Sequence, residues 1–79
     1  MGSKLSPGTF DCYANAEPDE PMFVLLARDA SAPDIVDVWA RTRENMIATG
    51  LKPESDRKMV LEAQQCAIAM HQWRARRRP

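Results

Sequence analysis

Asp19-Glu20-Pro21-Met22-Phe23-Val24-Leu25-Leu26-Ala27-Arg28-Asp29 is the stretch on which the fold depends. It holds the longest unbroken apolar run of the chain, Met22 to Ala27, and it ends in two opposite charges. A run with no polar face must be covered on both sides. We expect two amphipathic helices downstream to supply one cover and a second copy of the chain to supply the other.

The run itself allows two structures. As a strand it has a suitable length, it is bounded by Pro21 and Asp29, and its continuous apolar character fits burial on both faces. As a short helix it would begin with Asp19 as the N-cap, with Pro21 still in the first turn. The phenylalanine and valine favour a strand, whereas the leucines and alanine favour a helix. We favour an extended segment over residues 21–28, and the helix remains the alternative.

Upstream of this stretch, residues 1–18 are predicted to form an N-terminal arm and loop. Their glycine, serine and proline content offers little apolar surface to offset the entropy lost on ordering. Phe10 and Tyr13, three residues apart, are expected to cover the edge of a core. Residues 19–79 are predicted to form one small domain. A chain of 79 residues buries only about 60% of its unfolded surface, so self-association is the expected aid to stability.

Downstream, the first helix is predicted over residues 32–49. Ser31 lies three residues before Asp34, as in a weak capping box, and Pro33 falls in the first turn, where its missing N–H costs nothing. Gly50 suits the left-handed conformation that ends a helix. Apolar positions at helical spacing predict the core face, namely Ile35, Val38, Trp39, Met46 and Ile47.

A second helix is predicted over residues 54–75. Its main apolar stripe is Met59, Ala63, Cys66, Ala67, Met70 and Trp73. Leu61 and Ile68 form a weaker strip on another side, which indicates a subunit contact unless they are two of the scattered exposed apolar residues common on protein surfaces. The expected fold is therefore mainly α: a short extended segment followed by an antiparallel helix pair and completed by oligomerisation.

Charge and composition narrow the class of protein. Eleven basic and eleven acidic residues cancel, so no global field draws the chain onto nucleic acid. Two widely spaced cysteines do not match a disulfide-rich secreted domain. No apolar stretch approaches the roughly 20 residues that cross a bilayer, and the start has no hydrophobic signal core. We expect a soluble, cytoplasmic protein that does not bind membranes.

Arg28 and Asp29 are the first candidate site. A charged pair at the end of a buried run is often a solvated boundary or a structural ion pair. The functional alternative is that Arg28 offers a planar fork to a phosphate or carboxylate, while Asp29 caps the next turn or holds a ribose hydroxyl. The helix that Ser31 opens would add free backbone N–H groups beside them.

Aromatic residues supply further candidates. Trp39 and Trp73 lie on the predicted apolar stripes, so core packing is the ordinary interpretation, although an indole at a helix groove can stack on a base. Tyr13 is another candidate stacking group. Arg43 is included because it lies close to Trp39 in sequence.

The last six residues contain the one basic cluster, Arg74, Arg76, Arg77 and Arg78. Such a cluster either contacts nucleic-acid phosphates or acts as a solubilising tail that complements the negative end of the helix dipole. Cys66 and His71 are five residues apart, on different sides of a helix, so we expect no metal site and no cofactor. The lone histidine has no partner at a recognisable spacing, so we expect no enzyme.

The pattern Asp19-Glu20-Pro21-x-Phe23-Val24-Leu25-x-Ala27-x-Asp29, followed by Ala32-Pro33 and Trp39-Ala40, resembles a family of small proteins of tailed phages and prophages. The resemblance covers most of residues 19–73 and includes the ending Met70-x-x-Trp73. It implies a phage protein acting in the cytoplasm of an infected bacterium. Phage proteins of this size often bind host proteins or the nucleotide signals of host defence, which is an analogy of context.

Together these features predict a non-enzymatic homo-oligomer that sequesters a small anionic, nucleotide-derived defence signal. The expected ligand-binding residues are Arg28, Asp29, Trp39, Arg43 and Tyr13. The alternative function is a factor that binds a host protein or nucleic acid through its arginine-rich C-terminus.

Overall fold

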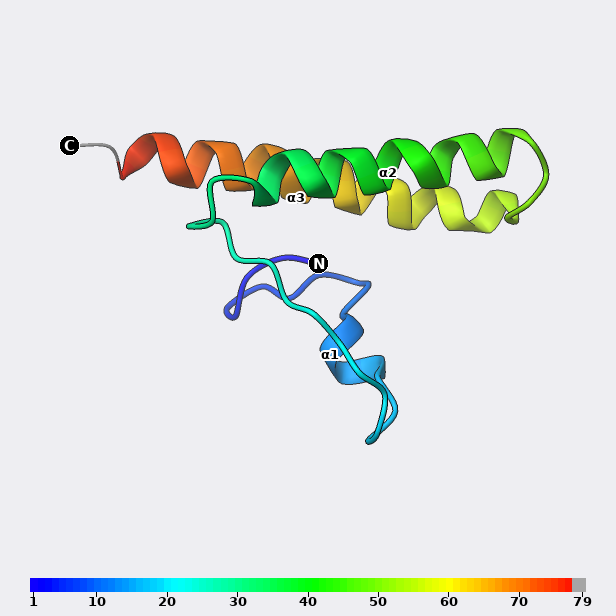
Figure 1. Ribbon diagram of the computed structural model, residues 1–79, viewed down its shortest axis with the longest axis horizontal. Coiled ribbons are helices and arrows are strands. Elements are labelled where there is room, and N and C mark those ends of the chain that lie inside the picture. Colours follow the sequence, from blue (N-terminus) through cyan, green and yellow to red (C-terminus); the bar gives the residue numbers. More distant parts are fainter. Residues whose placement is uncertain (78–79) are drawn as a thin grey trace.

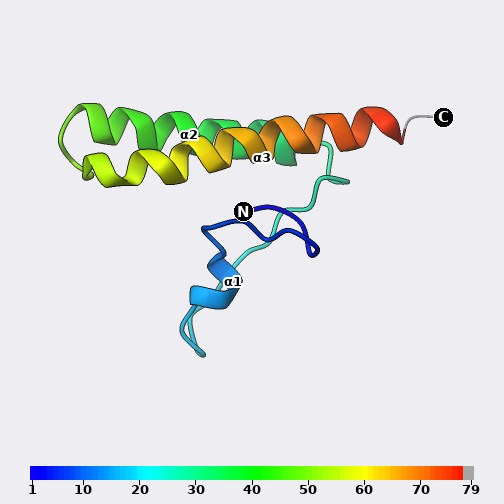
Figure 2. The same cartoon turned by 180° about the vertical axis from the view of Figure 1, so that it is seen from behind.

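A helical hairpin dominates the computed structural model, which describes residues 1–77. The hairpin pairs α2 (Ala32–Ala48) with α3 (Arg57–Arg76), and the short 3₁₀ turn η1 (Glu54–Asp56) leads into α3. Residues 1–31, with the single-turn helix α1 (Cys12–Asn15), stand off one side of the hairpin (Figures 1 and 2). The predicted mainly α class and the antiparallel helix pair are confirmed. None of the helices described is both long and apolar enough to cross a membrane.

The start of α2 is organised by Asp29. Its carboxylate accepts hydrogen bonds from the backbone N–H of Ser31 at 3.0 Å and from the Ser31 hydroxyl at 2.8 Å. The side chain of Ser31 therefore makes no hydrogen bond to the helix, and the predicted capping box does not form. Pro33 lies in the first turn as expected, where no hydrogen-bond donor is needed.

The end of α2 agrees with the sequence prediction. Gly50 has a left-handed φ of 81°. The backbone N–H of Gly50 donates to the Ile47 carbonyl at 3.1 Å, and that of Leu51 donates to the Met46 carbonyl at 2.8 Å. This pattern satisfies carbonyls that the helix end would leave free and turns the chain toward α3.

The core between the two helices is built mainly from small residues. Ala40 and Ala63 are completely buried; Ala40 lies at the middle of α2 and Ala63 in the first half of α3. The buried apolar residues are Ala32, Ala40 and Ile47 on α2 and Val60, Ala63 and Ala67 on α3. Alanines at facing positions let the helix backbones approach closely. The predicted stripe of α3 is thus partly confirmed, because its alanines are buried and its larger members are half-buried.

The predicted core face of α2 was wrong for its first three members. Ile35, Val38 and Trp39 are 47%, 55% and 39% exposed. The buried face of α2 is instead the adjacent one, which carries Ala40 and Ile47. The alanine-rich face of α3 favours close approach, and large side chains on α2 at that line would hold the helices apart. Two apolar faces therefore lie side by side on α2, and α3 covers one of them.

The N-terminal segment is fastened to α3 by Glu62. The Glu62 carboxylate accepts hydrogen bonds from the backbone N–H of Thr9 at 2.7 Å and of Phe10 at 2.9 Å, and it pairs with the amino group of Met1 at 3.2 Å. Gly8 has φ 84°, and a Cβ there would lie 2.9 Å from the Glu62 carboxylate. These hydrogen bonds hold the pKa of Glu62 below its usual value, with the Thr9 N–H as the largest cause.

The apolar run is largely uncovered in this single chain. Within the described part of the chain, residues 21–26 form neither a helix nor a strand. Phe23 is 86% exposed and Val24 is 66% exposed. Tyr13, on α1, is 77% exposed and does not cover the core edge as expected, whereas Phe10 is half-buried.

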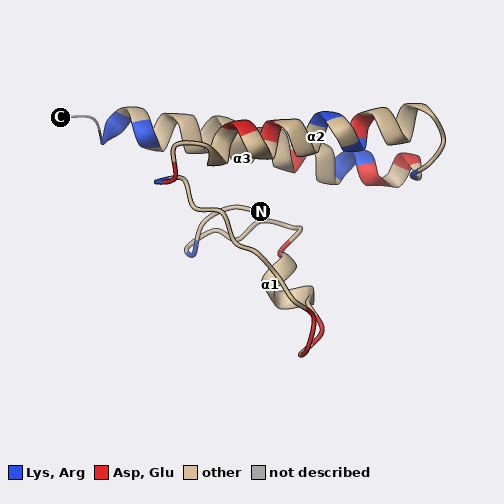
Figure 3. Cartoon of the chain, viewed as in Figure 1, with Lys and Arg blue, Asp and Glu red and all other residues tan. Residues whose placement is uncertain are grey.

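Charges of opposite sign gather in different places. Figure 3 shows acidic residues at the tip of the N-terminal segment and basic residues at the end of α3, whereas both signs are interleaved along the rest of the hairpin. The net charge of zero therefore conceals two local clusters of opposite sign.

Candidate ligand pocket

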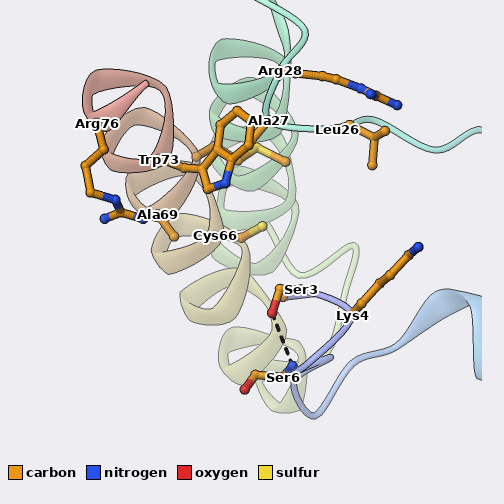
Figure 4. Close-up of a pocket in the computed structure, with 12 residues that line it drawn as sticks. Ser3, Lys4, Ser6, Leu26, Ala27, Arg28, Cys66, Ala69, Trp73 and Arg76 are labelled. Atoms are coloured by element: carbon orange, nitrogen blue, oxygen red, sulfur yellow. Dashed lines mark hydrogen bonds between the residues drawn. The ribbon is translucent and has the colours of Figure 1, made fainter. Parts of the chain in front are cut away.

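A pocket of about 800 Å³ lies between the N-terminal segment and the C-terminal half of α3 (Figure 4). This volume falls within the range of roughly 300–1,000 Å³ typical of small-molecule sites. Three parts of the chain line it, and the lining residues are Gly2, Ser3, Lys4, Ser6, Leu26, Ala27, Arg28, Cys66, Ala69, Met70, Trp73 and Arg76.

The floor of the pocket is one face of α3. Cys66, Met70 and Trp73 recur at intervals of four and three residues, which places them on one side of the helix. This flank is next to the face that packs on α2. Leu26 and Ala27, from the end of the apolar run, add further apolar surface. The floor therefore suits a flat apolar body such as an aromatic ring.

Three cations surround this floor. Lys4 comes from the N-terminal arm, Arg28 from the end of the apolar run and Arg76 from the last turn of α3. Figure 4 shows Lys4 and Arg28 to one side of the Trp73 indole and Arg76 to the other. Within residues 1–77, none of the three pairs with a carboxylate and no carboxylate lines the pocket. The pocket should therefore favour anions.

Arg74 fixes one wall of the pocket. Its Nη1 donates to the backbone carbonyl of Arg28 at 3.0 Å and to that of Ala27 at 3.3 Å. These contacts join residues 46 and 47 positions apart in sequence. The guanidinium thus holds the Arg28 backbone against α3, and the Arg28 side chain remains free to meet a ligand.

The indole of Trp73 is held in place by Arg77, one turn further along the chain. The Arg77 guanidinium carbon lies 4.1 Å from the centre of the indole ring, a cation–π contact. The contact orients the indole at the pocket wall. Arg74 and Arg77 are therefore engaged within the chain, whereas the structure leaves Arg76 at the pocket. Arg78, the fourth residue of the predicted basic cluster, lies outside the described residues.

The Cys66 thiol contributes apolar surface to the floor. Burial raises the pKa of this thiol, so it stays protonated at neutral pH. A protonated thiol is a poor nucleophile and a poor metal ligand. Among residues 1–77, no three histidine, cysteine or acidic side chains lie close enough together to hold a metal ion.

Only one of the five ligand-binding residues expected from the sequence lies in this pocket, and it is Arg28. Asp29 is next to it but is engaged with Ser31, whose backbone hydrogen bond is the main reason that the pKa of Asp29 is lowered. Tyr13 is on α1 and does not line the pocket.

Trp39 and Arg43 lie together on α2, away from the pocket lining. The Arg43 guanidinium carbon is 5.1 Å from the centre of the Trp39 ring. Arg43 also pairs with Asp56, at 3.3 Å between Nη1 and Oδ2. This arginine therefore braces α2 against the start of α3.

Sequence reasoning did not assign Lys4, Cys66 or Met70 to a ligand site. The spacing of Cys66, Met70 and Trp73 gave no separate signal, because the sequence places them on the same apolar stripe as Ala63 and Ala67. Lys4 gave no signal, since its place at the pocket depends on the Glu62 contacts more than fifty residues away.

Comparison with known proteins gives no relative for this chain. No family model matches it, and no significant match was found among curated proteins or solved structures.

Proposed function

We propose that this chain is a non-enzymatic binding protein that sequesters a small anionic, nucleotide-derived ligand as a homo-oligomer. In keeping with the sequence resemblance, the proposed setting is phage infection, with a host defence signal as the ligand and the host cytoplasm as the site of action. The observation that carries the proposal is the pocket around an indole floor, where three cations pair with no carboxylate of residues 1–77 and no carboxylate is among the described lining.

The base and the phosphates of a nucleotide each have a matching group in this pocket. A base can lie against Trp73 and Met70, and its phosphates can reach Arg28, Lys4 or Arg76. Arginine is the side chain best suited to a phosphate, because its planar fork donates two parallel hydrogen bonds. The raised pKa of the Cys66 thiol, and a described lining that contains no acid–base pair, fit binding better than catalysis.

Self-association is supported by the exposed apolar surface. Met22, Phe23, Val24 and Leu26 are each about half exposed or more in one chain. Contiguous apolar surface of this kind commonly marks a protein–protein contact. A neighbouring copy would cover the run and close the side of the pocket that Leu26 lines.

A panel of nucleotides and cyclic dinucleotides tests the binding proposal. A ligand that binds only the folded state raises the free energy of unfolding, by about 2.7 kcal/mol at a concentration of 100 times its dissociation constant. The midpoint temperature of thermal unfolding rises as a result. We expect a shift for at least one member of the panel and none for the matching uncharged nucleosides. No shift with any phosphate-bearing member would contradict the proposal.

Arg28→Ala locates the binding site. We expect this variant to lose ligand binding while its helix content and assembly state are unchanged. The hydrogen bonds from Arg74 to the carbonyls of residues 27 and 28, which we call the Arg74 clamp, hold the backbone of residue 28 and not its side chain. Lys58→Ala is a matched control, since Lys58 is an exposed cation on α3 outside the pocket. Unchanged binding by Arg28→Ala would move the site elsewhere.

The salt dependence of binding separates this function from the nucleic-acid alternative. Binding of a long polyanion by an arginine cluster weakens steeply as salt rises, because each neutralised phosphate releases a counterion. Binding of a small ligand in a pocket weakens far less. With Arg74 and Arg77 engaged inside the chain, we expect the shallow dependence.

A further inference from the structure

The uncovered face of α2 is a second apolar surface, separate from the pocket and from the N-terminal run. Its members recur at helical spacing over three turns and include no charged residue; they are Ile35, Val38, Trp39, Thr42 and Met46. Val38 is 55% exposed and Ile35 is 47% exposed. The Thr42 hydroxyl donates to the Val38 carbonyl at 2.8 Å, so it needs no further partner and its methyl group remains available for packing.

Two charged residues border this face on one edge. Asp34 and Arg41 are seven residues apart, or about two turns, and each is a helical neighbour of Val38. The Asp34 side chain is 81% exposed, and its one ion-pair contact among residues 1–77 is with His71, at 3.8 Å. Arg41 is exposed and pairs with no carboxylate among residues 1–77.

The order of these charges selects an antiparallel partner with the same sequence. In an antiparallel pair of α2 helices, Asp34 of each copy meets Arg41 of the other when the two-fold axis passes between residues 37 and 38. Ile35 of one copy would lie opposite Thr42 of the other if the two-fold axis passed between residues 38 and 39. This position is one residue, or about 1.5 Å, from the axis that the charges require. A parallel pair would instead place like charges opposite each other, which is unfavourable.

We propose that the face formed by Ile35, Val38, Trp39, Thr42 and Met46 packs on the same face of a second copy, with the two α2 helices antiparallel and Asp34 of each opposite the partner's Arg41. This inference rests on the self-association in the proposed function and names one of its contacts. It does not depend on the ligand, because these residues do not line the pocket.

Disulfide trapping between two different chains tests the antiparallel register. Both chains carry Cys12→Ser and Cys66→Ala; one also carries Asp34→Cys and the other Arg41→Cys, with different tags so that the products are resolved by mass. In the proposed pair, two copies of position 34 are about 10 Å apart along the axis, too far for a disulfide, whereas positions 34 and 41 are opposite. We expect the mixed disulfide to exceed either homodisulfide by about tenfold.

A control chain with Glu44→Cys in place of Arg41→Cys should form no excess of mixed disulfide, because Glu44 faces Arg57 on the other side of α2. Homodisulfides that equal or exceed the mixed product would overturn the proposal in favour of a parallel pair. Absence of every disulfide would overturn it in favour of another cover for this face, such as the run Met22 to Leu26 of a neighbouring chain.

Exchanging the charges at positions 34 and 41 is an independent test, in which sedimentation measures the dissociation constant of the pair. Asp34→Arg or Arg41→Asp alone should raise the dissociation constant of the pair about tenfold, because the two-fold axis makes each change act twice. The double variant should return to within about threefold of the parent. Circular dichroism of each variant separates a loss of pairing from a loss of folding. A double variant as weak as the two single changes combined would show that these residues do not face each other.

Val38→Asp, on the face and next to the two-fold axis, should abolish the pair at concentrations where the parent chain is associated. Leu51→Asp is the matched control, since Leu51 is 74% exposed in the loop beyond α2. Equal effects of the two substitutions would overturn the assignment of this face.

Discussion

The hairpin and the N-terminal segment use apolar residues in opposite ways. In the hairpin, alanine, valine and isoleucine at helical spacing find partners on the neighbouring helix of the same chain. In residues 1–31, the most apolar stretch of the sequence remains exposed, and the segment is held by polar contacts to Glu62 and Arg74 and by Met1, which packs against the hairpin core. Periodicity, more than apolar content, therefore decides whether one short chain can bury its own surface.

The largest expected effect comes from overfilling the hairpin core. Ala63 is completely buried against α2, so Ala63→Leu should force the helices apart and destabilise the fold by about 2 kcal/mol or more. Thermal unfolding followed by circular dichroism should show a midpoint lower by about 10 °C. Ala48→Leu, at an exposed position near the end of α2, should leave the midpoint nearly unchanged. Equal midpoints for the two variants would mean that the alanine core is loosely packed.

Removing the carboxylate that fastens the N-terminal segment should affect that segment alone. Glu62→Ala removes the acceptor for the Thr9 and Phe10 amides. We expect hydrogen exchange at these two amides to accelerate on the order of tenfold, while amides in the middle of α2 keep their protection. Glu44→Ala is the control, because that residue contacts Arg57 within the hairpin. A general loss of protection would show that the two regions unfold together.

Acid should reproduce this release without a mutation. The pKa of Glu62 is lower in the folded chain than its ordinary value of 4.5, so its ionised form stabilises attachment of the segment at neutral pH. This stabilisation is fully present above a pH of about 4.5, and it is lost as the pH falls through the lowered pKa. The protection factors of the Thr9 and Phe10 amides, which correct for the slower intrinsic exchange in acid, should therefore fall only below about pH 4.5, and not in Glu62→Ala. A fall that begins well above that pH would point to a different group.

The two cysteines permit the mildest comparison between the regions. Cys12 is exposed in α1, whereas Cys66 is half-buried in the pocket floor and burial raises its thiol pKa. Iodoacetamide should modify Cys12 several times faster than Cys66, as measured by mass spectrometry of peptides. A ligand in the pocket should slow only the reaction at Cys66. Slowing at both sites would show that the ligand acts by ordering the whole chain.

The sequence predicted the helix pair because both helices carry strong local signals. Pro33 marks the start of α2 and Gly50 its end, and α3 has a four-turn apolar stripe. The buried face of α2 was predicted wrongly, because large apolar residues dominate a periodicity analysis. In the structure the face that packs on α3 carries mainly alanines. The choice of face depends on the alanines of the opposite helix, which is a tertiary effect.

The candidate site was much less predictable. Arg28 could be identified because it directly follows the apolar run. The remaining architecture depends on contacts between residues far apart in sequence, namely Glu62 with Thr9 and Phe10 and Arg74 with the backbone of residues 27–28. Polar contacts between residues so far apart leave no periodic pattern and no local motif in the sequence. Arg74 looked like one member of a basic tail, and its role as a clamp emerged only from the fold.

The Arg74 clamp also bears on how such a pocket can evolve. Its acceptors are the main-chain carbonyls of Ala27 and Arg28, and every amino acid supplies a main-chain carbonyl. The residue type at position 28 can therefore change while the wall of the pocket keeps its place. Single substitutions at the rim can then change the chemistry of the pocket without first rebuilding the scaffold. A clamp made of two side chains would couple these changes and slow such adaptation.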